Sequence, residues 1–232
     1  MFYDLHSHSA LSPCADDDMT PAVIAGMMAV AKADIFAITD HNSARNLEAA
    51  QKAADFYEIK LLPGIEVNSA EEIHLLCYFS GLDAALEMGE RIYESLPAIA
   101  VDTKIWGEQL VIDENDEIID KVEKLLSLAS SYDIYEILDM VKGLDGIVVP
   151  AHVDRDSNSL VQILGFMPDD LDIHVVEMTN RTKYEGYVSK RQLPSGLEIV
   201  TSSDAHSINQ LIGDSLSRLN RNSKLMRLIE RL

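Results

Sequence analysis

The chain has 232 residues, of which 47% are hydrophobic, enough for one sizeable hydrophobic core. This composition is not that of a disordered, collagen-like or coiled-coil protein. The formal net charge of −20 argues against a surface for long nucleic acid, because affinity for a phosphate backbone comes mostly from lysine and arginine.

Membrane insertion and secretion are not indicated by the sequence. No apolar run approaches the roughly 20 residues that cross a bilayer, and the N-terminus MFYDLH is unlike a signal peptide. The two cysteines, Cys14 and Cys77, lack CxxC spacing, which excludes a disulfide framework, and free thiols fit a reducing compartment. We therefore expect a cytoplasmic protein without a membrane partner.

Short β-branched runs alternate with helical stretches, which predicts an α/β fold with a largely parallel sheet. Thr20 and Pro21 predict the start of a helix, and Ser43 precedes a second helical pattern. A leucine pattern after Ser207 predicts a final helical tail that packs on the fold. Seven strands are predicted, at 1–5, 34–39, 59–66, 72–79, 146–150, 172–178 and 197–201.

The segment 83–142 departs from a minimal α/β repeat. It contains two strand-like pieces around the polar turn DEND, followed by a helix that begins near Asp133 and ends at Gly143. We expect residues 1–232 to form one domain with an inserted α+β segment at 83–142. This insertion could cap the mouth of a site or form an oligomer contact, and the sequence leaves the oligomeric state open.

Histidines follow the predicted strands, and each lies beside an acid or another histidine. The C-terminal ends of the first, second, fifth and seventh strands lead to such motifs, and these ends lie at one rim of a parallel barrel. The segment between Glu66 and His74 is too short for a crossover helix, so an antiparallel hairpin should return His74 to the same rim. His174 begins its strand and should lie at the opposite rim. The motifs at the site rim contain His6, His8, His41, His152 and His206.

This pattern predicts a metal centre, since histidine and carboxylate side chains bind zinc, manganese and iron. A single motif would be weak, because an HxH pair can simply fill one face of a strand. Asp40 could cap the following helix or accept a hydrogen bond from a ligand imidazole. Cys14 is most simply a loop thiol, although it is also a minor candidate ligand.

The motifs DLHSHS, TDHN, PGIEV, EIH, PAH and SDAH, in this order, resemble the PHP (polymerase and histidinol phosphatase) family of metal-dependent phosphoesterases. The resemblance runs from Asp4 to His206 with an interruption between about Asp83 and Lys142. It implies a distorted (β/α)7 barrel with the inserted cap segment. It also implies a trinuclear site that binds two or three divalent ions, which are zinc, manganese or iron.

The resemblance also assigns ligands. It implies one metal held by His6, His8, Glu66 and Asp204, and a second held by Glu66, His74 and His152, so that Glu66 bridges the two. The third metal would take Asp16, His41 and His206. Asp17 competes with Asp16, because CADDDMTP stands where many members have a compact turn. Glu66, Asp204 and His206 are expected to take part in catalysis as ligands.

The expected chemistry is hydrolysis of a phosphate ester by a metal-activated hydroxide, since metals lower the pKa of bound water and clamp the attacking and leaving oxygens. The sequence has no GxSxG elbow and no Walker loop. Arg155 is the favoured phosphate anchor, with Arg181 and Lys183 as further candidates. We expect a small phosphorylated metabolite or a short nucleotide as substrate, and long nucleic acid as an unlikely ligand. The alternative is a metal-binding regulatory or structural domain without turnover.

Overall fold

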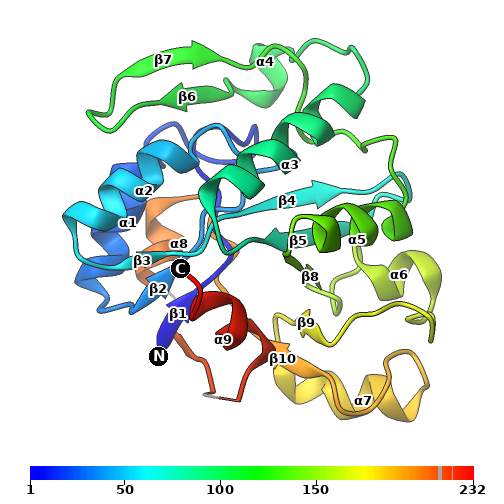
Figure 1. Cartoon of the computed structure of the whole chain (residues 1–232). Coiled ribbons are helices and arrows are strands. Elements are labelled where there is room, and N and C mark those ends of the chain that lie inside the picture. The colour runs from blue at the N-terminus through cyan, green and yellow to red at the C-terminus, as the bar shows by residue number, and fades with distance from the viewer. Residues whose placement is uncertain (214–215, 221) are drawn as a thin grey trace.

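The protein is a mixed α/β structure in which helices surround several small sheets (Figure 1). The computed structural model describes residues 1–213, 216–220 and 222–232. Its strands are β1 (Phe2–Asp4), β2 (Ile35–Phe36), β3 (Lys60–Leu61), β4 (Gly64–Asn68), β5 (His74–Tyr78), β6 (Leu110–Ile112), β7 (Ile118–Lys121), β8 (Ile147–Pro150), β9 (Val175–Glu177), β10 (Glu198–Val200) and β11 (Ser217–Arg218).

Helices follow most of these strands and cover the outside of the sheets (Figure 1). They are α1 (Pro21–Val30), α2 (Leu47–Phe56), α3 (Leu82–Ser95), α4 (Thr103–Trp106), α5 (Ile134–Gly143), α6 (Leu160–Leu164), the 3-10 helix η1 (Arg181–Lys183), α7 (Tyr184–Ser189), α8 (Ile208–Gly213) and α9 (Lys224–Ile229). Among the helices of the described residues, none combines the length and the apolar character that a bilayer crossing demands.

The strands form four separate sheets, with the orders β11-β1-β2-β3, β4-β5-β8, β9-β10 and β6-β7. The closed (β/α)7 barrel that we expected is not observed among the described residues. Strands β2 and β3 are only two residues long, so their ladders end before neighbouring sheets can join. Isolated bridges, Ser7 to Ala205 and His41 to Glu66, link the sheets at the end where the histidines lie.

Each of the seven predicted strand segments contains a strand. The third splits into β3 and β4 around Pro63, which has no amide hydrogen to donate to a ladder. Strands β4 and β5 pair antiparallel, with Glu66 opposite Leu76 and Asn68 opposite His74, as the short connection predicted. Strand β11 was not predicted, because it lies within the segment that we expected to be helical.

Helix starts follow the expected capping chemistry in part. The Thr20 side chain accepts a hydrogen bond from the Val23 amide, and Asp133 forms a capping box with Glu136. Ser43 is not a cap, since α2 starts after Asn46. The predicted C-terminal tail is divided into α8 and α9, and its leucines at 211, 219, 225 and 228 are buried, as expected for a packed tail.

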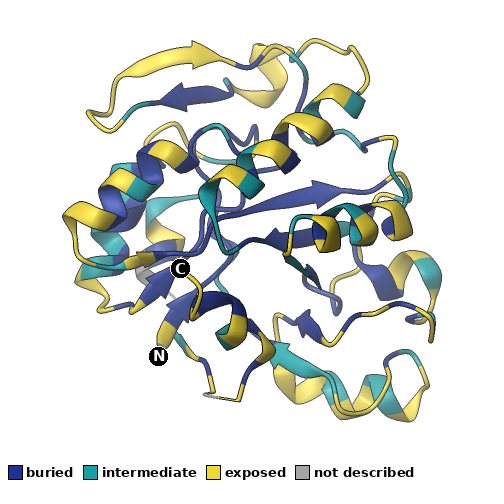
Figure 2. Cartoon of the chain, viewed as in Figure 1, coloured by how far each residue is buried: buried dark blue, intermediate teal, exposed yellow. Residues whose placement is uncertain are grey.

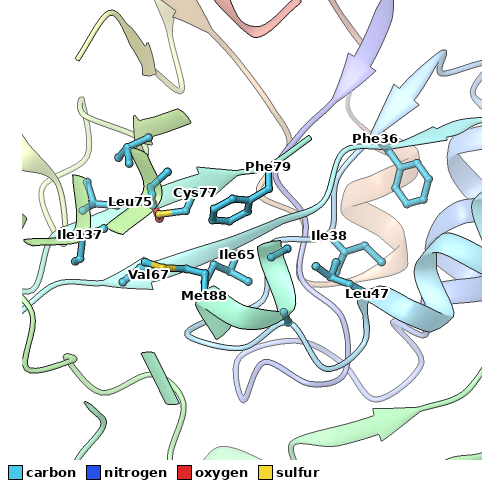
Figure 3. Close-up of a cluster of buried hydrophobic side chains, with 14 of the residues drawn as sticks. Phe36, Ile38, Leu47, Ile65, Val67, Leu75, Cys77, Phe79, Met88 and Ile137 are labelled. Carbon is cyan, nitrogen blue, oxygen red and sulfur yellow. The ribbon is translucent and has the colours of Figure 1, made fainter. Parts of the chain in front are cut away.

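Alternation along the strands divides the core into two clusters. In β5, Leu75 and Cys77 point to the cluster under the helices, which Figure 3 shows with Phe79, Ile65 and Met88. Leu76 and Tyr78 point to the other face and pack with residues of β1, β2, β8, β9, β10 and α9. Figure 2 shows the central strands β4, β5 and β8 buried and the outer helix surfaces exposed. Glu66 is opposite Leu76 and therefore lies on this second, inner face.

The predicted insertion contains α3, α4, the antiparallel β6–β7 hairpin and α5. The hairpin lies at the top of Figure 1, and Figure 2 shows β6 buried and β7 exposed. Asn42 donates hydrogen bonds to the carbonyls of Leu126 and Leu128, at 2.6 and 2.8 Å. The amide of Leu110 donates to the carbonyl of Ala10. The insertion is thus fastened to the loops that follow His8 and His41.

Candidate metal centre

Six of the seven histidines gather in one cluster, and five of them contact the buried carboxylate of Glu66 of β4. Glu66 is 1% exposed and comes from the inner face of its strand. Five imidazole nitrogens lie within 3.4 Å of its oxygens, which is the separation expected of groups that share cations or protons. The distances are 3.4 Å from His6, 3.3 Å from His8, 3.1 Å from His41, 3.0 Å from His74 and 3.4 Å from His152.

Asp204 is the second acid of the cluster. Its Oδ1 lies 3.1 Å from Nε2 of both His6 and His8, and its Oδ2 lies 2.5 Å from an Nη of Arg155. Asp204 has a φ of +50°, a left-handed conformation that aspartate tolerates better than most residues. Its amide donates to the carbonyl of His6, so the loop after β10 is fixed against the loop after β1.

His206 completes the group of six. Its Nδ1 lies 2.7 Å from the backbone carbonyl of Asp204, which makes Nδ1 the protonated nitrogen and leaves Nε2 free. Its ring stacks on that of His8, with centroids 4.3 Å apart. His174, which we expected at the opposite rim, is exposed and lies 3.0 Å from Asp172.

Hydrogen bonds behind the histidines fix their tautomers. His6 Nδ1 donates to Glu177 Oε2 at 2.9 Å, and Glu177 also accepts from the amide of His152. His8 Nδ1 lies 3.1 Å from Ser12 Oγ, whose hydroxyl donates to Asp40 at 2.7 Å. Both Nε2 atoms therefore face Glu66 and Asp204, where each can carry a proton in the metal-free chain or bind a cation in its place.

Asp40 neither caps a helix nor accepts a hydrogen bond directly from a ligand imidazole, which were the two roles expected for it. Asp40 accepts from the hydroxyls of Ser9 and Ser12 and from the Ser9 amide, and it reaches an imidazole only through Ser12. Glu177 was not predicted as a site residue. An isolated acid inside the apolar run HVVEM was the signal that could have identified it.

The electrostatics of the cluster follow from burial and from the close acids. Burial lowers the pKa of His8, but its hydrogen bonds to Asp204 and Glu66 prevail and raise the pKa to about 9. Burial and the nearby His8 lower the pKa of His206 to about 4. Burial raises the pKa of Glu66, but the surrounding histidines outweigh it and hold that pKa well below its usual range. Glu66 is therefore an anion at neutral pH.

The donor atoms fit divalent cations in three overlapping groups. In each group one ligand atom of every residue lies within 4.8 Å of the others. His41 Nδ1 is buried and makes no hydrogen bond, although Glu66 Oε2 lies 3.1 Å away, so this nitrogen is unsatisfied among the described residues. The groups are His6, His8 and Glu66; His41, Glu66 and His74; and His8, Cys14, His41 and His206.

Asp16 is not part of these groups. Its side chain is exposed, as are those of Asp17 and Asp18, and its backbone amide donates to the His206 carbonyl at 2.9 Å. Cys14 takes the position beside His41 and His206 that we expected for Asp16.

The three predicted phosphate anchors lie in different surroundings. Arg155 reaches the cluster through Asp204, and its side chain is 41% exposed. It lines a cavity of about 160 Å³ together with His152 and Asp204. Arg181 donates to the Ile199 carbonyl, and Lys183 pairs with Asp154 at 3.3 Å, so both are engaged away from Glu66.

Comparison with solved structures identifies the fold. A candidate metal-dependent phosphoesterase from Bifidobacterium adolescentis is 19% identical, and the match covers 99% of this chain and 96% of that one with a TM-score of 0.60. An amidohydrolase from Chromobacterium violaceum is 18% identical, with coverage of 99% and 96% and a TM-score of 0.64. A lesion-specific endonuclease from Pyrococcus furiosus is 18% identical, with a TM-score of 0.62 over 90% of this chain. The chain spans about half, 49%, of that endonuclease.

These matches show that the chain shares its fold with a metal-dependent phosphoesterase, an amidohydrolase and an endonuclease, which confirms the resemblance at the level of the fold. Among sequence relatives, an uncharacterized protein of Methanocaldococcus jannaschii is 22% identical over 220 residues, which cover 94% of this chain and 87% of that protein. No protein-family profile matches the sequence.

The expectation that long nucleic acid is an unlikely ligand is wrong. Endonuclease Q shares this fold at 18% identity with a TM-score of 0.56, and it forms a complex with a 27-mer duplex that has an abasic lesion at the active site. The net charge of −20 describes the whole surface, whereas the field at a metal centre is dominated by its cations. Net charge therefore gives no reason to exclude a DNA substrate.

Proposed function

We propose that the protein is a metal-dependent phosphoesterase whose centre holds two or three divalent cations around Glu66. The observation that carries this proposal is the set of five imidazole nitrogens within 3.4 Å of one buried carboxylate. A carboxylate with two oxygens and neighbours on both sides is suited to bridge cations. The metal-dependent phosphoesterase and the endonuclease that share the fold support the same reaction class.

The bound cations would activate water and compensate the charge of a phosphoryl group. His6, His8, Glu66 and Asp204 would hold one cation. Glu66, His74 and His152 would hold a second, and His41 and His206 would contribute to a third. Glu177 and the Ser12–Asp40 pair orient His6 and His8, so that their ligating nitrogens face inward before any cation arrives.

Arg155 is the group that we propose to position the substrate. Its guanidinium lies at the rim, half exposed, and pairs with Asp204, which is itself in contact with His6 and His8. A guanidinium can hold two phosphate oxygens in a bidentate grip. We propose no such role for Arg181 and Lys183, because Arg181 donates to the Ile199 carbonyl and Lys183 pairs with Asp154, both outside the cluster.

The insertion is proposed to act as a cap over the mouth of the centre. Its contacts are made with residues that directly follow the site motifs: Asn42 beside His41, and Asn68 at the end of β4. A cap in this position restricts the mouth and influences which phosphate esters enter.

The test combines metal analysis with turnover. The purified chain is stripped, reloaded with Mn²⁺, Zn²⁺ or Fe²⁺, and assayed on phosphomonoesters, on nucleotide 3′,5′-bisphosphates and on duplex DNA with an abasic site. We expect bound metal, turnover of at least one of these substrates, and loss of both in His8→Ala. His174→Ala, which changes an exposed histidine outside the cluster, should retain both the bound metal and the turnover.

Two outcomes would overturn the phosphoesterase proposal. Stoichiometric metal without turnover on any phosphate ester would favour a regulatory or structural domain. Full turnover by the stripped protein in the presence of chelator would exclude the cluster from the reaction.

A further inference from the structure

Cys14 lies on a loop that is held rigidly against the centre. The loop starts after His8, and the hydroxyls of Ser9 and Ser12 donate to Asp40 at 2.6 and 2.7 Å. On the far side of Cys14, the Asp16 amide donates to the carbonyl of His206. The thiol is thus fixed between two anchors, one beside His8 and one on His206 itself.

The sulfur of Cys14 and one nitrogen each of His8, His41 and His206 all lie within 4.8 Å of one another. In a tetrahedral zinc site, bonds of about 2.3 Å to sulfur and about 2.0 Å to nitrogen put ligand atoms roughly 3.3 to 3.7 Å apart. The four atoms need only a small contraction to surround one ion. The buried His41 Nδ1 has no hydrogen-bond partner among the described residues, so one polar atom of a proposed ligand is unsatisfied in the metal-free cluster.

We propose that Cys14 is a metal ligand and that, together with His41 and His206, it forms the third cation site. This inference rests on the proposed metal centre and deepens it. Cys14 takes the role that the family resemblance assigned to Asp16. Both side chains are exposed, but it is the sulfur of Cys14 that lies within 4.8 Å of the histidine nitrogens, while the backbone of Asp16 serves as an anchor of the loop. His8 stacks on His206 and lies between this site and the pair of sites at Glu66.

A thiolate changes which metal the site prefers. Sulfur ligands favour zinc and related thiophilic ions, whereas oxygen ligands suit manganese and magnesium. The third site should therefore select Zn²⁺ over Mn²⁺. Replacing Cys14 with aspartate should reduce the preference for Zn²⁺ over Mn²⁺ without removing the site.

The experiment uses the full chain and two readouts that do not depend on activity. The chain is loaded with Co²⁺, and its near-ultraviolet spectrum is examined for thiolate-to-cobalt charge transfer. Separately, the Zn²⁺-loaded chain is treated with iodoacetamide, and the modified cysteines are identified by mass spectrometry. Cys77 is fully buried and serves as an internal control for unfolding. The variants are Cys14→Ala, Cys14→Asp and, as the matched control, Asp16→Ala.

We expect charge transfer in the wild type and in Asp16→Ala, and none in Cys14→Ala. Zinc should protect Cys14 from alkylation, and chelator should restore its reactivity while Cys77 stays unmodified. Cys14→Ala should bind about one metal fewer per chain, and Cys14→Asp should regain it with Mn²⁺. No charge transfer in a cobalt-loaded wild type, or Cys14 that is alkylated at the same rate with and without zinc, would overturn the assignment.

Phosphate ester turnover, measured in parallel, reports on the proposed function separately. A chain that hydrolyses esters while its Cys14 stays reactive would refute the cysteine ligand and leave the phosphoesterase intact. A chain with cobalt–thiolate absorption but no turnover on any ester would refute the phosphoesterase and leave the cysteine ligand intact.

Discussion

Glu66 belongs to two of the three overlapping groups of ligand atoms. Removing its charge should therefore affect more than one cation. We expect Glu66→Gln to lose bound metal, and to lose kcat/KM by more than the roughly 100-fold that loss of an outer hydrogen bond costs. Metal content after gel filtration and ester turnover measure the two effects. Glu48→Gln, an exposed change on α2, should alter neither.

Substitution of Glu177 tests separately the side chains that orient the proposed metal ligands by hydrogen bonds. Its Oε2 accepts from the ring of His6 and from the amide of His152, so it orients two ligands at once. We expect Glu177→Ala to weaken metal affinity about 10- to 100-fold, with Glu177→Gln less affected because an amide oxygen can still accept. Competition with a chromogenic chelator measures the affinity. Unchanged affinity in Glu177→Ala would contradict this role.

The sequence predicts those site residues that lie in recognisable local motifs. His6, His8, His41 and His206 lie in motifs that pair histidine with histidine or acid, directly after apolar runs. Glu177 lacks such a motif, and its importance comes from a contact across 171 residues of chain, which no local pattern reveals. The choice among Asp16, Asp17 and Cys14 could not be made from the sequence for a similar reason, since the loop conformation decides which of them lies near the histidines.

At the scale of elements, the βαβ order, the β4–β5 hairpin and the β6–β7 hairpin could be predicted from apolar periodicity and connection length. Closure of the sheets into a barrel could not be predicted, because it depends on how many residues of each strand pair with the neighbouring strand before the chain turns into a loop. Strand β11 was missed because it pairs Phe2 with Arg218, a contact between the two ends of the chain.

Asn42 connects the element scale to the site, since it fastens the insertion to the loop of His41. It donates to the Leu126 and Leu128 carbonyls and accepts from the Asn68 amide at 2.9 Å. Asn42→Ala leaves these groups unpaired, at about 1 to 3 kcal/mol for each one that water cannot reach. We therefore expect a loss of about 3 kcal/mol in the free energy of unfolding, measured by urea denaturation.

A second substitution separates the hydrogen bonds of Asn42 from its backbone. Asn42 has a φ of +52°, which glycine adopts freely and alanine does not. Asn42→Gly should therefore lose about 1 kcal/mol less than Asn42→Ala. Asn115→Ala, in the exposed turn of the β6–β7 hairpin, should change stability by less than about 0.5 kcal/mol. An Asn42→Ala variant as stable as the wild type would mean that the insertion is held by other contacts.

Over the whole molecule, an excess of 20 negative charges surrounds a centre built to hold cations. The acids counted in this net charge include Glu66 and Asp204, which are buried among the histidines. In the metal-free chain, these two acids are balanced by protons on histidines. Metal binding must displace those protons, so metal loading and pH are linked for the entire fold.

This linkage predicts opposite pH dependences for the metal-free and metal-loaded protein. In the metal-free chain, hydrogen bonds to Asp204 and Glu66 overcome burial and raise the pKa of His8 from 6.5 to about 9. A raised folded-state pKa stabilises the protein fully below pH 6.5, and this stabilisation is lost as the pH rises towards 9. The loss amounts to about 3 kcal/mol for a shift of this size. Cations compete with the same protons, so the metal-loaded chain should instead gain in Tm over this window.

Thermal unfolding from pH 6.5 to 9, with chelator and with Zn²⁺, measures both slopes. Asp204→Asn removes the main partner of the His8 proton and should flatten the decline of the chelated protein, because the pKa of His8 then lies nearer its ordinary value. The depressed pKa of His206, about 4, acts at lower pH and leaves this window unaffected. If the chelated wild type kept a constant Tm up to pH 9, the protons of the empty centre would not lie on His8, and the balance of charge around Glu66 would have to come from other groups.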